Sequence, residues 1–143
     1  MPNLSTLYVS HNLGFHIPRE KFSQLFGSLR SLQAFYMGNF EMESINKNTF
    51  ANLTRLTRLY LYRNKLTDIP DGAFDSLHSL TVLVPSDNQI QTVRESSFSL
   101  NISEILLYVT VVFSGFRSNL FLRRLCSKTH TKTTLAVTFL IHP

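Results

Sequence analysis

Phenylalanine recurs at a fixed interval of 24 residues over the first two thirds of the chain. The four positions are Phe26, Phe50, Phe74 and Phe98, and after each of the first three a leucine follows at the third and sixth positions. A fixed interval of roughly 20–50 residues is typical of a solenoid, because one repeat cannot bury its apolar face without its neighbours. We therefore predict a stack of similar coils, with the four phenylalanines stacked in a single row and with function on a repeated surface rather than in a catalytic pocket.

The repeated unit has the frame Leu-x-x-Leu-x-Leu-x-x-Asn-x-Leu-x-x-Ile, with further copies starting at Leu4, Leu32 and Leu80. The best copy consists of Leu56, Leu59, Leu61, Asn64, Leu66 and Ile69. The Leu-x-Leu alternation has the period of a strand with one buried face. We expect Leu59 and Leu61 to point inward and Tyr60 and Tyr62 outward. Asn64 carries amide donors and an acceptor that can satisfy backbone groups at the following turn.

Some copies depart from this frame. Phe40 occupies the asparagine position of the second unit. Whether Asn39, one position earlier, takes over the role of the missing asparagine stays open. Gly14 occupies a leucine position, which the adjacent Leu13 could fill instead. Pro85 takes the second inward strand position of the fourth unit. Because proline has no N–H for a sheet ladder, we expect the regular sheet to weaken there.

This frame resembles the leucine-rich repeat family, in the 24-residue form common in extracellular receptors. The resemblance covers roughly residues 1–100. The stretch Phe50–Leu83 is similar to ectodomain repeats of Toll-like receptors and related extracellular repeat proteins. The resemblance implies an α/β solenoid, a right-handed superhelix with about four parallel strands on the concave face and loops or irregular helical turns on the convex face. Four extra residues between Pro18 and Phe26 are expected to bulge on the convex side.

Two regions are predicted, a solenoid of four repeats over residues 1–98 and an irregular tail over residues 99–143. Nearly all of the net charge of +5 lies in the tail, which has one acidic residue. Its basic residues are Arg117, Arg123, Arg124, Lys128 and Lys132. We interpret them as a solvated or disordered end rather than a nucleic-acid site, so no nucleic-acid partner is expected.

The tail also contains the apolar run Ile105–Phe116, which is shorter than the roughly 20 residues of a spanning helix. Three interpretations stay open: a short membrane anchor over residues 105–122, a strand or helix that covers the last repeat, or non-native sequence from a truncated or misread gene.

The ends of the chain lack features that usually accompany extracellular repeats. Cys126 is the single cysteine, so neither a disulfide within the chain nor a cysteine-rich cap is expected. Met1 leads directly into a repeat, without the basic and apolar regions of a signal peptide. The resemblance implies an extracellular or cell-surface location. We expect a fragment or truncated product of a longer receptor-like protein, and the alternative is a short intracellular repeat protein.

Three outward columns of the repeat line the concave face in this architecture. The first contains Tyr8, Tyr36, Tyr60 and Val84, the second Ser10, Gly38, Tyr62 and Ser86, and the third His11, Asn39, Arg63 and Asp87. Tyrosine and arginine are enriched at interface hot spots. The candidate partner-binding residues are Tyr8, His11, Tyr36, Tyr60, Tyr62, Arg63 and Asp87. The alternative is that tyrosine is present because it favours strands and stacks along a sheet.

Three Asn-x-Ser/Thr sequons are candidate glycosylation sites, at Asn3, Asn52 and Asn101. Such triplets also arise by chance. Asn52 is the best of the three because it is expected on the outer side of its coil, away from the strand.

No arrangement of residues suggests catalysis. The histidines are scattered, and Cys126 with His130 is interpreted as a coincidence in the tail. The five glycines are isolated, so no phosphate-binding loop is expected, and neither is a cofactor or metal ion.

We therefore expect a non-enzymatic module that binds a protein or other macromolecular ligand on its concave face. The resemblance implies a receptor-like ectodomain in innate immunity or adhesion. The alternatives are a truncated or structural fragment without independent function and a soluble intracellular adaptor. A membrane contact would come through the parent protein or residues 105–122.

Overall fold

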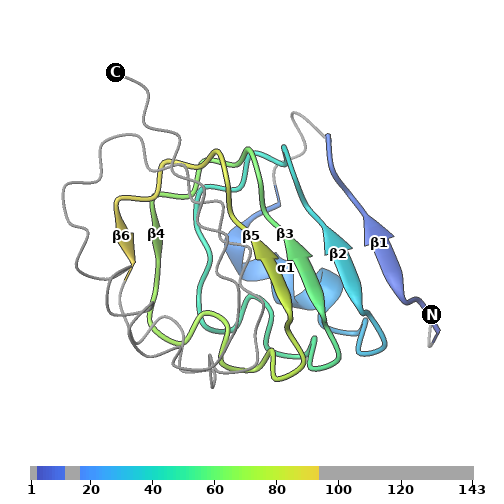
Figure 1. The fold of residues 1–143 in the computed structure, drawn as a ribbon. Coiled ribbons are helices and arrows are strands. Elements are labelled where there is room, and N and C mark those ends of the chain that lie inside the picture. The colour runs from blue at the N-terminus through green and yellow to red at the C-terminus, as the bar shows by residue number, and fades with distance from the viewer. Residues whose placement is uncertain (1–2, 12–16, 94–143) are drawn as a thin grey trace, which may run out of the picture.

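A computed structural model describes residues 3–11 and 17–93. Four strands of three residues each form a parallel sheet in the order β1-β2-β3-β5 (Figure 1). They are β1 (Thr6–Tyr8), β2 (Ala34–Tyr36), β3 (Arg58–Tyr60) and β5 (Val82–Val84). Each strand belongs to one coil, and the middle residues Leu7, Phe35, Leu59 and Leu83 are aligned in register. The predicted solenoid with four parallel strands is confirmed.

The alternation of the strands separates buried from outward side chains as the sequence pattern predicts. Leu59 and Leu61 are both fully buried, whereas Tyr60 and Tyr62 between and after them are only half-buried. The ladder continues one residue beyond the strand, because the Leu61 N–H donates to the Val84 carbonyl at 2.8 Å. Leu7, Phe35 and Leu83 in the other coils turn the same way and contribute to the core.

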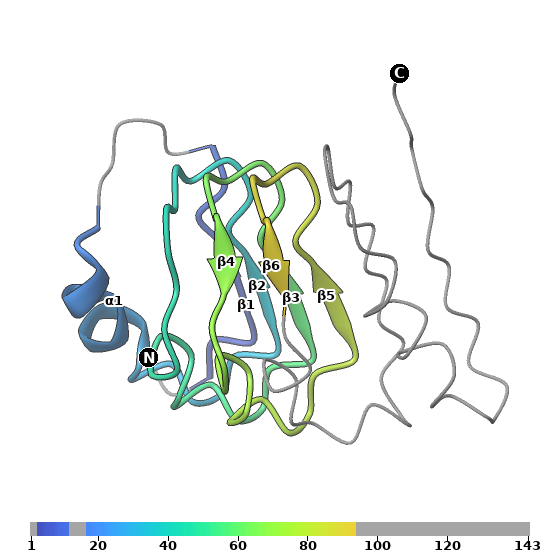
Figure 2. The same cartoon turned by 90° about the vertical axis from the view of Figure 1, so that its left-hand side faces the viewer.

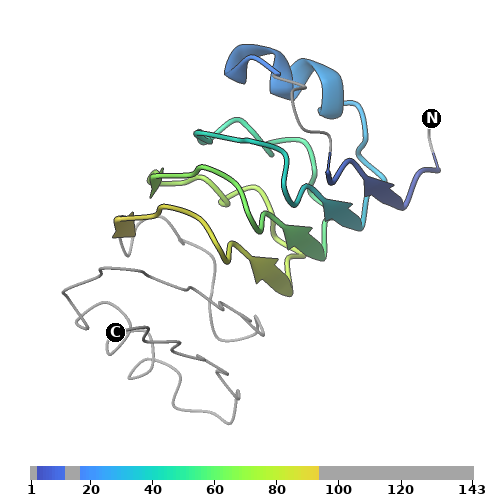
Figure 3. The same ribbon diagram turned by 90° about the horizontal axis from the view of Figure 1, so that it is seen from above.

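The return side of the coils carries a second parallel sheet that the sequence did not predict. It pairs β4 (Asp68–Ile69) with β6 (Thr92–Val93). Figure 3 shows this pair across the coils from the main sheet. Ile69 precedes Pro70, and the proline ring favours an extended conformation for the residue before it. The Gln91 N–H donates to the Thr67 carbonyl at 2.9 Å, which extends the contact between the two coils.

The extra residues of the first repeat form helix α1 (Arg19–Phe26). The helix follows Pro18, whose carbonyl accepts the Lys21 N–H at 2.9 Å, and the Gly27 N–H closes it by donating to the Ser23 carbonyl at 2.8 Å. Figures 2 and 3 show α1 at the β1 end of the stack, on the return side of the first coil. The insertion therefore lies where it was expected, and it is helical rather than an irregular bulge.

The phenylalanine row is only partly the row that the 24-residue interval predicts. Phe50 and Phe74 stack with centroids 6.1 Å apart and an interplanar angle of 16°. On the other side, Phe50 meets Phe22 of α1 edge-to-face at 5.8 Å. Phe22 is 3% exposed, whereas Phe26 is half-buried and packs at 5.1 Å on Phe35.

The expectation of one row through Phe26 is thus wrong at this end of the stack. The cause is the helix, which places Phe22 and Phe26 on one face, four residues apart, with ring centroids 4.7 Å apart. The first turn of α1 therefore brings Phe22, rather than Phe26, against the Phe50 ring. Phe98 lies outside the described residues.

Asn64 is buried in the turn after β3 and confirms the predicted role of the repeat asparagine. Its Oδ1 accepts the N–H groups of Phe40 and Met42 at 3.1 and 3.0 Å. Its Nδ2 donates to the carbonyls of Met37 and Leu61, both at 2.9 Å. One side chain thus joins two coils and satisfies backbone groups that the turn exposes. Asn88 repeats the arrangement one coil later, donating to the Pro85 carbonyl at 2.9 Å.

Phe40, in the asparagine position of the second coil, is buried among apolar side chains. Asn39 does not substitute for the missing amide, because its Nδ2 lies 3.2 Å from Nδ1 of His11 instead. The neighbouring Glu41 has a φ of 61°, a left-handed backbone that non-glycine residues adopt at a cost. Gly14 and Leu13, the other departure from the frame, lie outside the described residues.

The sheet was expected to weaken at Pro85, and on the β3 side it does not. Residues Val82–Val84 pair fully with Arg58–Tyr60, and Pro85 is buried. In the preceding coil the equivalent residue, Leu61, donates its N–H forward to the next coil. The donor that proline lacks therefore points away from β3, so the pairing with β3 is intact.

Candidate partner-binding face

The outward side of the main sheet, which we call the strand face, carries a row of stacked tyrosines. The rings of Tyr8 and Tyr36 lie 4.2 Å apart at 13°, and those of Tyr36 and Tyr60 lie 4.4 Å apart at 6°. The row follows from the register, which pairs Tyr8 with Tyr36 and Tyr36 with Tyr60. Tyr8 is 68% exposed, so the row opens to solvent at its β1 end. The structure thus brings the three predicted tyrosines together.

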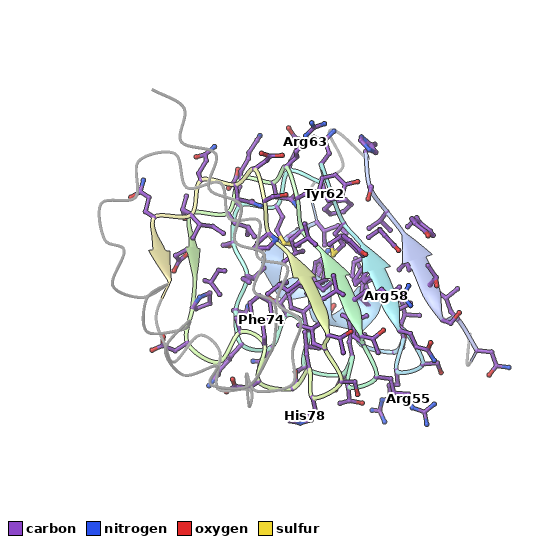
Figure 4. All side chains as sticks on the ribbon, viewed as in Figure 1. Arg55, Arg58, Tyr62, Arg63, Phe74 and His78 are labelled. Atoms are coloured by element: carbon purple, nitrogen blue, oxygen red, sulfur yellow. The ribbon has the colours of Figure 1, made fainter. Side chains whose placement is uncertain are left out.

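Tyr62 lies beside this row (Figure 4), and its ring approaches Gly38 of the neighbouring coil. A Cβ added at Gly38 would collide with the Tyr62 ring. A side chain at this position would therefore force the Tyr62 ring to move. The Gly38 N–H donates to Oγ of Ser10 at 3.1 Å, so the second column is connected across three coils.

The third column marks the edge of the strand face with four left-handed residues. The φ angles of His11, Asn39, Arg63 and Asp87 are 64°, 55°, 52° and 54°. Their side chains pair between neighbouring coils, His11 with Asn39 and Arg63 with Asp87, the Nε–Oδ2 distance of the ion pair being 3.6 Å. Both partners of the ion pair are exposed, so it contributes little to stability. The predicted residues Arg63 and Asp87 are thus adjacent at the edge of the tyrosine row.

Arg58 belongs to the same face and was missed by the sequence analysis. It stands two residues before Tyr60 in β3, so the strand period places it on the outward side (Figure 4). Its positive charge offsets part of the rise in the pKa of Tyr8 and Tyr60, as the smallest of the causes that act on these two phenols. The signal that could have found it is the period of two, applied backward from Tyr60 as well as forward.

Tyr8 and Tyr60 stay neutral in spite of Arg58, because the pKa of each phenol is raised. Hydrogen bonding with Tyr36 is the main cause that raises the pKa of Tyr8 above its usual 10.0. Partial burial is the main cause that raises the pKa of Tyr60, and the Arg58 charge offsets only part of each shift. The hydroxyl groups of Tyr8 and Tyr60 therefore remain available as hydrogen-bond donors at neutral pH.

Two of the three candidate glycosylation sites, Asn3 and Asn52, lie outside the strands of the strand face. Asn52 is exposed in the turn that leads toward β3, and Asn3 is exposed before β1. A Cβ at Gly27 would lie 3.0 Å from Nδ2 of Asn52, so the absence of a side chain there leaves space beside the amide. Asn101 lies outside the described residues, and so do Cys126, His130 and the segment 105–122.

A cavity of about 240 Å³ lies on the return side, between the first and second coils. Its lining includes Phe22, Phe40, Met42 and the carboxylate-bearing Glu41 and Glu43. Glu41 is engaged with Lys65, the Oε1–Nζ distance being 3.1 Å. The cavity contains none of the predicted partner-binding residues.

Within residues 3–11 and 17–93, no cluster of three or more His, Cys, Asp or Glu side chains could hold a metal ion. Across the same part of the chain, no helix combines the length and apolar character needed to cross a membrane.

Stacked coils with a parallel sheet, a repeated turn asparagine and a stacked tyrosine row define a repeat solenoid. The profile described as "Leucine rich repeat" matches residues 2–66 and 54–105. The chain belongs to the leucine-rich repeat family, and that prediction is confirmed.

Several curated proteins are similar to it. Epiphycan of Gallus gallus is 38% identical over 71 residues, 50% of this chain and 22% of that protein. Lumican of Rattus norvegicus is 31% identical over 104 residues, 73% of this chain and 29% of that protein. Oligodendrocyte-myelin glycoprotein of Homo sapiens is 42% identical over 53 residues, 37% of this chain and 12% of that protein. The chain thus spans less than a third of the length of each of these relatives.

Among solved structures, the leucine-rich repeat domain of APL1B superposes with a TM-score of 0.65 at 22% identity. The match covers 75% of this chain and 30% of the other. It supports the fold. The narrower likeness to Toll-like receptor ectodomains stays a prediction.

Proposed function

We propose that the chain is a non-enzymatic binding module that recognises a protein or other macromolecular partner through its strand face. The residues that carry recognition are Tyr8, His11, Tyr36, Tyr60, Tyr62, Arg63 and Asp87, together with Arg58. The module acts as part of a receptor-like, extracellular or cell-surface protein. Residues 1–98 form the repeat region of this module, and residues 99–143 form a separate tail.

The observation that carries the proposal is the stacked tyrosine row, which remains open to solvent although the other side of the same strands is a closed core. Stacking fixes the rings before a partner arrives, so little side-chain entropy is lost on binding. Tyrosine and arginine are also the residue types that contribute most to interface energies. Tyrosine also favours strands, which by itself could account for Tyr8, Tyr36 and Tyr60. Even then, a partner would gain from the fixed positions of the three stacked rings.

The extracellular part of the proposal is supported by the comparisons. The repeat is shared with lumican and epiphycan, and one relative is named as a glycoprotein. The exposed sequons at Asn3 and Asn52 agree with passage through the secretory pathway.

A binding screen tests the function. The full chain, displayed as a multimer, would be screened against purified secreted and cell-surface proteins, and each interaction measured with a face variant, Tyr60→Ala/Tyr62→Ala/Arg63→Ala. We expect the variant to lower the affinity for a true partner by at least tenfold, because truncated hot-spot residues each cost more than about 1 kcal/mol.

The matched control is Leu25→Ala/Lys47→Ala/Asp68→Ala, which truncates three exposed side chains on α1 and the return side. We expect this control to keep the affinity. Unchanged binding by the face variant, or loss only in the control, would contradict the proposal.

A further inference from the structure

Charges are distributed unevenly between the strands and the return side of the described coils. The segments that lead into and run through β2, β3 and β5 carry Arg30, Arg55 and Arg58 and no Asp or Glu. These segments are residues 28–36, 52–62 and 76–84. The carboxylates of the described coils lie on α1, in the turns after the strands or on the return side. Asp87, at the edge of the strand face, is already paired with Arg63. Of the three arginines, Arg58 lies in a strand, whereas Arg30 and Arg55 lie in the segments that lead into β2 and β3. Within the described residues, the strand face therefore carries the positive charge of Arg58 without a carboxylate to balance it.

The tyrosine row adds to this positive character. Rings that lie 4.2 and 4.4 Å apart cover one another's faces, where the π-electron density is negative. A partner therefore meets ring edges, which are positive, and hydroxyl groups. The raised pKa values of Tyr8 and Tyr60 keep their hydroxyls protonated, so they donate rather than repel an anion. A cation would find little to bind on this row.

Arg58 lies exposed beside the row and is not part of an ion pair within the described residues. The other cations near the edge of the face, Arg63 and Lys65, are engaged with Asp87 and Glu41. A guanidinium group has a planar set of donors that matches a carboxylate in a bidentate contact. Arg58 is thus the available cation beside the aromatic row.

We propose that the strand face binds an extended acidic segment of a protein partner, with a carboxylate of that segment paired to Arg58 and its backbone and apolar side chains against Tyr8, Tyr36 and Tyr60. The inference rests on the proposed function and names the chemistry of the partner. A protein segment fits better than a sulfated glycan, because a polyanion needs a row of cations. The residues equivalent to Arg58 in the other coils, Thr6, Ala34 and Val82, carry no charge.

Two fluorescent ten-residue peptides with the same apolar residues, one carrying glutamates and the other lysines in their place, provide the test. Their affinity for the full chain would be measured by anisotropy. We expect the acidic peptide to bind more tightly, and Arg58→Ala to weaken its binding about tenfold, since a charged hydrogen-bonded contact is lost. Arg58→Glu should reverse the preference between the peptides, and Arg58→Lys should weaken binding less than Arg58→Ala does. Lys47→Ala, which removes the same charge from an exposed return-side position, should leave binding unchanged.

Any of the following results overturns the inference. If Tyr60→Ala weakens peptide binding and the Arg58 variants do not, the face binds peptides without selecting acidic ones, and the proposed function stands. If neither peptide binds, or if substitution of neither Tyr60 nor Arg58 changes binding, an acidic segment is not the ligand. The partner screen with the face variant then tests the proposed function separately. Stronger Arg58-dependent binding of a heparin oligosaccharide would make the ligand a glycan. Arg58-dependent self-association in sedimentation would make it a second copy of the chain.

Discussion

At the scale of single residues, an asparagine side chain joins neighbouring coils in the turns after β3 and β5. Asn64 joins two coils through hydrogen bonds in both directions, and it is 6% exposed. An amide side chain offers two N–H donors and a carbonyl acceptor, which is the set that the two coils require here. Where Phe40 replaces it, the backbone of the next residue, Glu41, becomes left-handed. The sequence pattern predicted the role of Asn64 correctly because the role depends on local geometry.

Asn64→Ala should therefore lower the free energy of unfolding by about 3 kcal/mol, since it leaves buried donors and acceptors without partners. Urea unfolding of the full chain, followed by circular dichroism, measures the change. Asn48→Ala is the control, because Asn48 is exposed on the return side and should change stability by less than about 0.5 kcal/mol. Equal effects of the two substitutions would contradict the proposed role of Asn64.

The tyrosine row predicts a delayed alkaline titration. Tyr8 and Tyr60 should ionise above pH 10.0, and Tyr36→Phe should bring Tyr8 closer to that value by removing its main hydrogen-bonding cause. Because the pKa values of Tyr8 and Tyr60 are raised in the folded chain, the interactions of their neutral forms add to the free energy of unfolding below pH 10.0. That contribution is lost as the pH rises through the folded-state pKa values. NMR of chain labelled at tyrosine Cζ resolves each ring. Ionisation of Tyr8 at or below the value of free tyrosine would argue against stacked rings in solution.

At the scale of elements, α1 shows where the repeat pattern is insufficient. An eight-residue helix is marginal by itself, so its stability comes from docking. The interval of 24 residues pointed to Phe26 as the core residue, but the helix gives the deeper position to Phe22. An interval between repeats cannot report the geometry of an insertion within one of them.

Phe22→Ala should consequently destabilise the chain by about 3–5 kcal/mol, the usual cost of emptying a buried phenylalanine site. Phe26→Ala should cost clearly less, about 1 kcal/mol, because Phe26 is only half-buried. Thermal and urea unfolding of both variants provide the comparison. A larger loss of stability in Phe26→Ala than in Phe22→Ala would make Phe26 the core residue, as the 24-residue interval predicts.

The strands were predictable because alternation over Leu59, Tyr60 and Leu61 is a property of neighbouring residues. The β4–β6 pair was not predicted, because two-residue strands have no period to detect. The sheet was predicted to weaken at Pro85 because proline has no backbone N–H to donate. Only the order of the strands shows that this N–H would point away from β3.

At the scale of the whole molecule, the sequence predicted the columns of the strand face correctly and their chemistry incompletely. The stacked rings follow from the register of the strands, which the repeat frame sets even where the first unit is longer than the others. Arg58 was missed, although it stands on the same face, because the columns were counted forward from the strand centre. The charge of the strand face depends on where the described carboxylates lie around each coil. Those positions are known only from the three-dimensional path of the chain.

The location of the molecule can be tested through Asn52. If the chain is expressed in secretory cells behind an added leader, we expect glycan at Asn52, which is exposed and away from the strand face. Digestion with an N-glycosidase, followed by mass spectrometry, identifies the site, and Thr54→Ala should abolish its occupancy without changing the asparagine. An unmodified Asn52 in folded, secreted chain would favour the intracellular alternative.

Hydroxyl-radical footprinting of the full chain with a bound partner would show whether the partner covers the strand face, because tyrosine side chains react readily and report their own accessibility. We expect binding to protect Tyr8, Tyr36, Tyr60 and Tyr62 from oxidation, whereas Leu25, which is 53% exposed on α1, should react as it does in the free chain. Protection of Leu25 and the return side, with the tyrosines still reactive, would show that the partner binds elsewhere and would contradict the account.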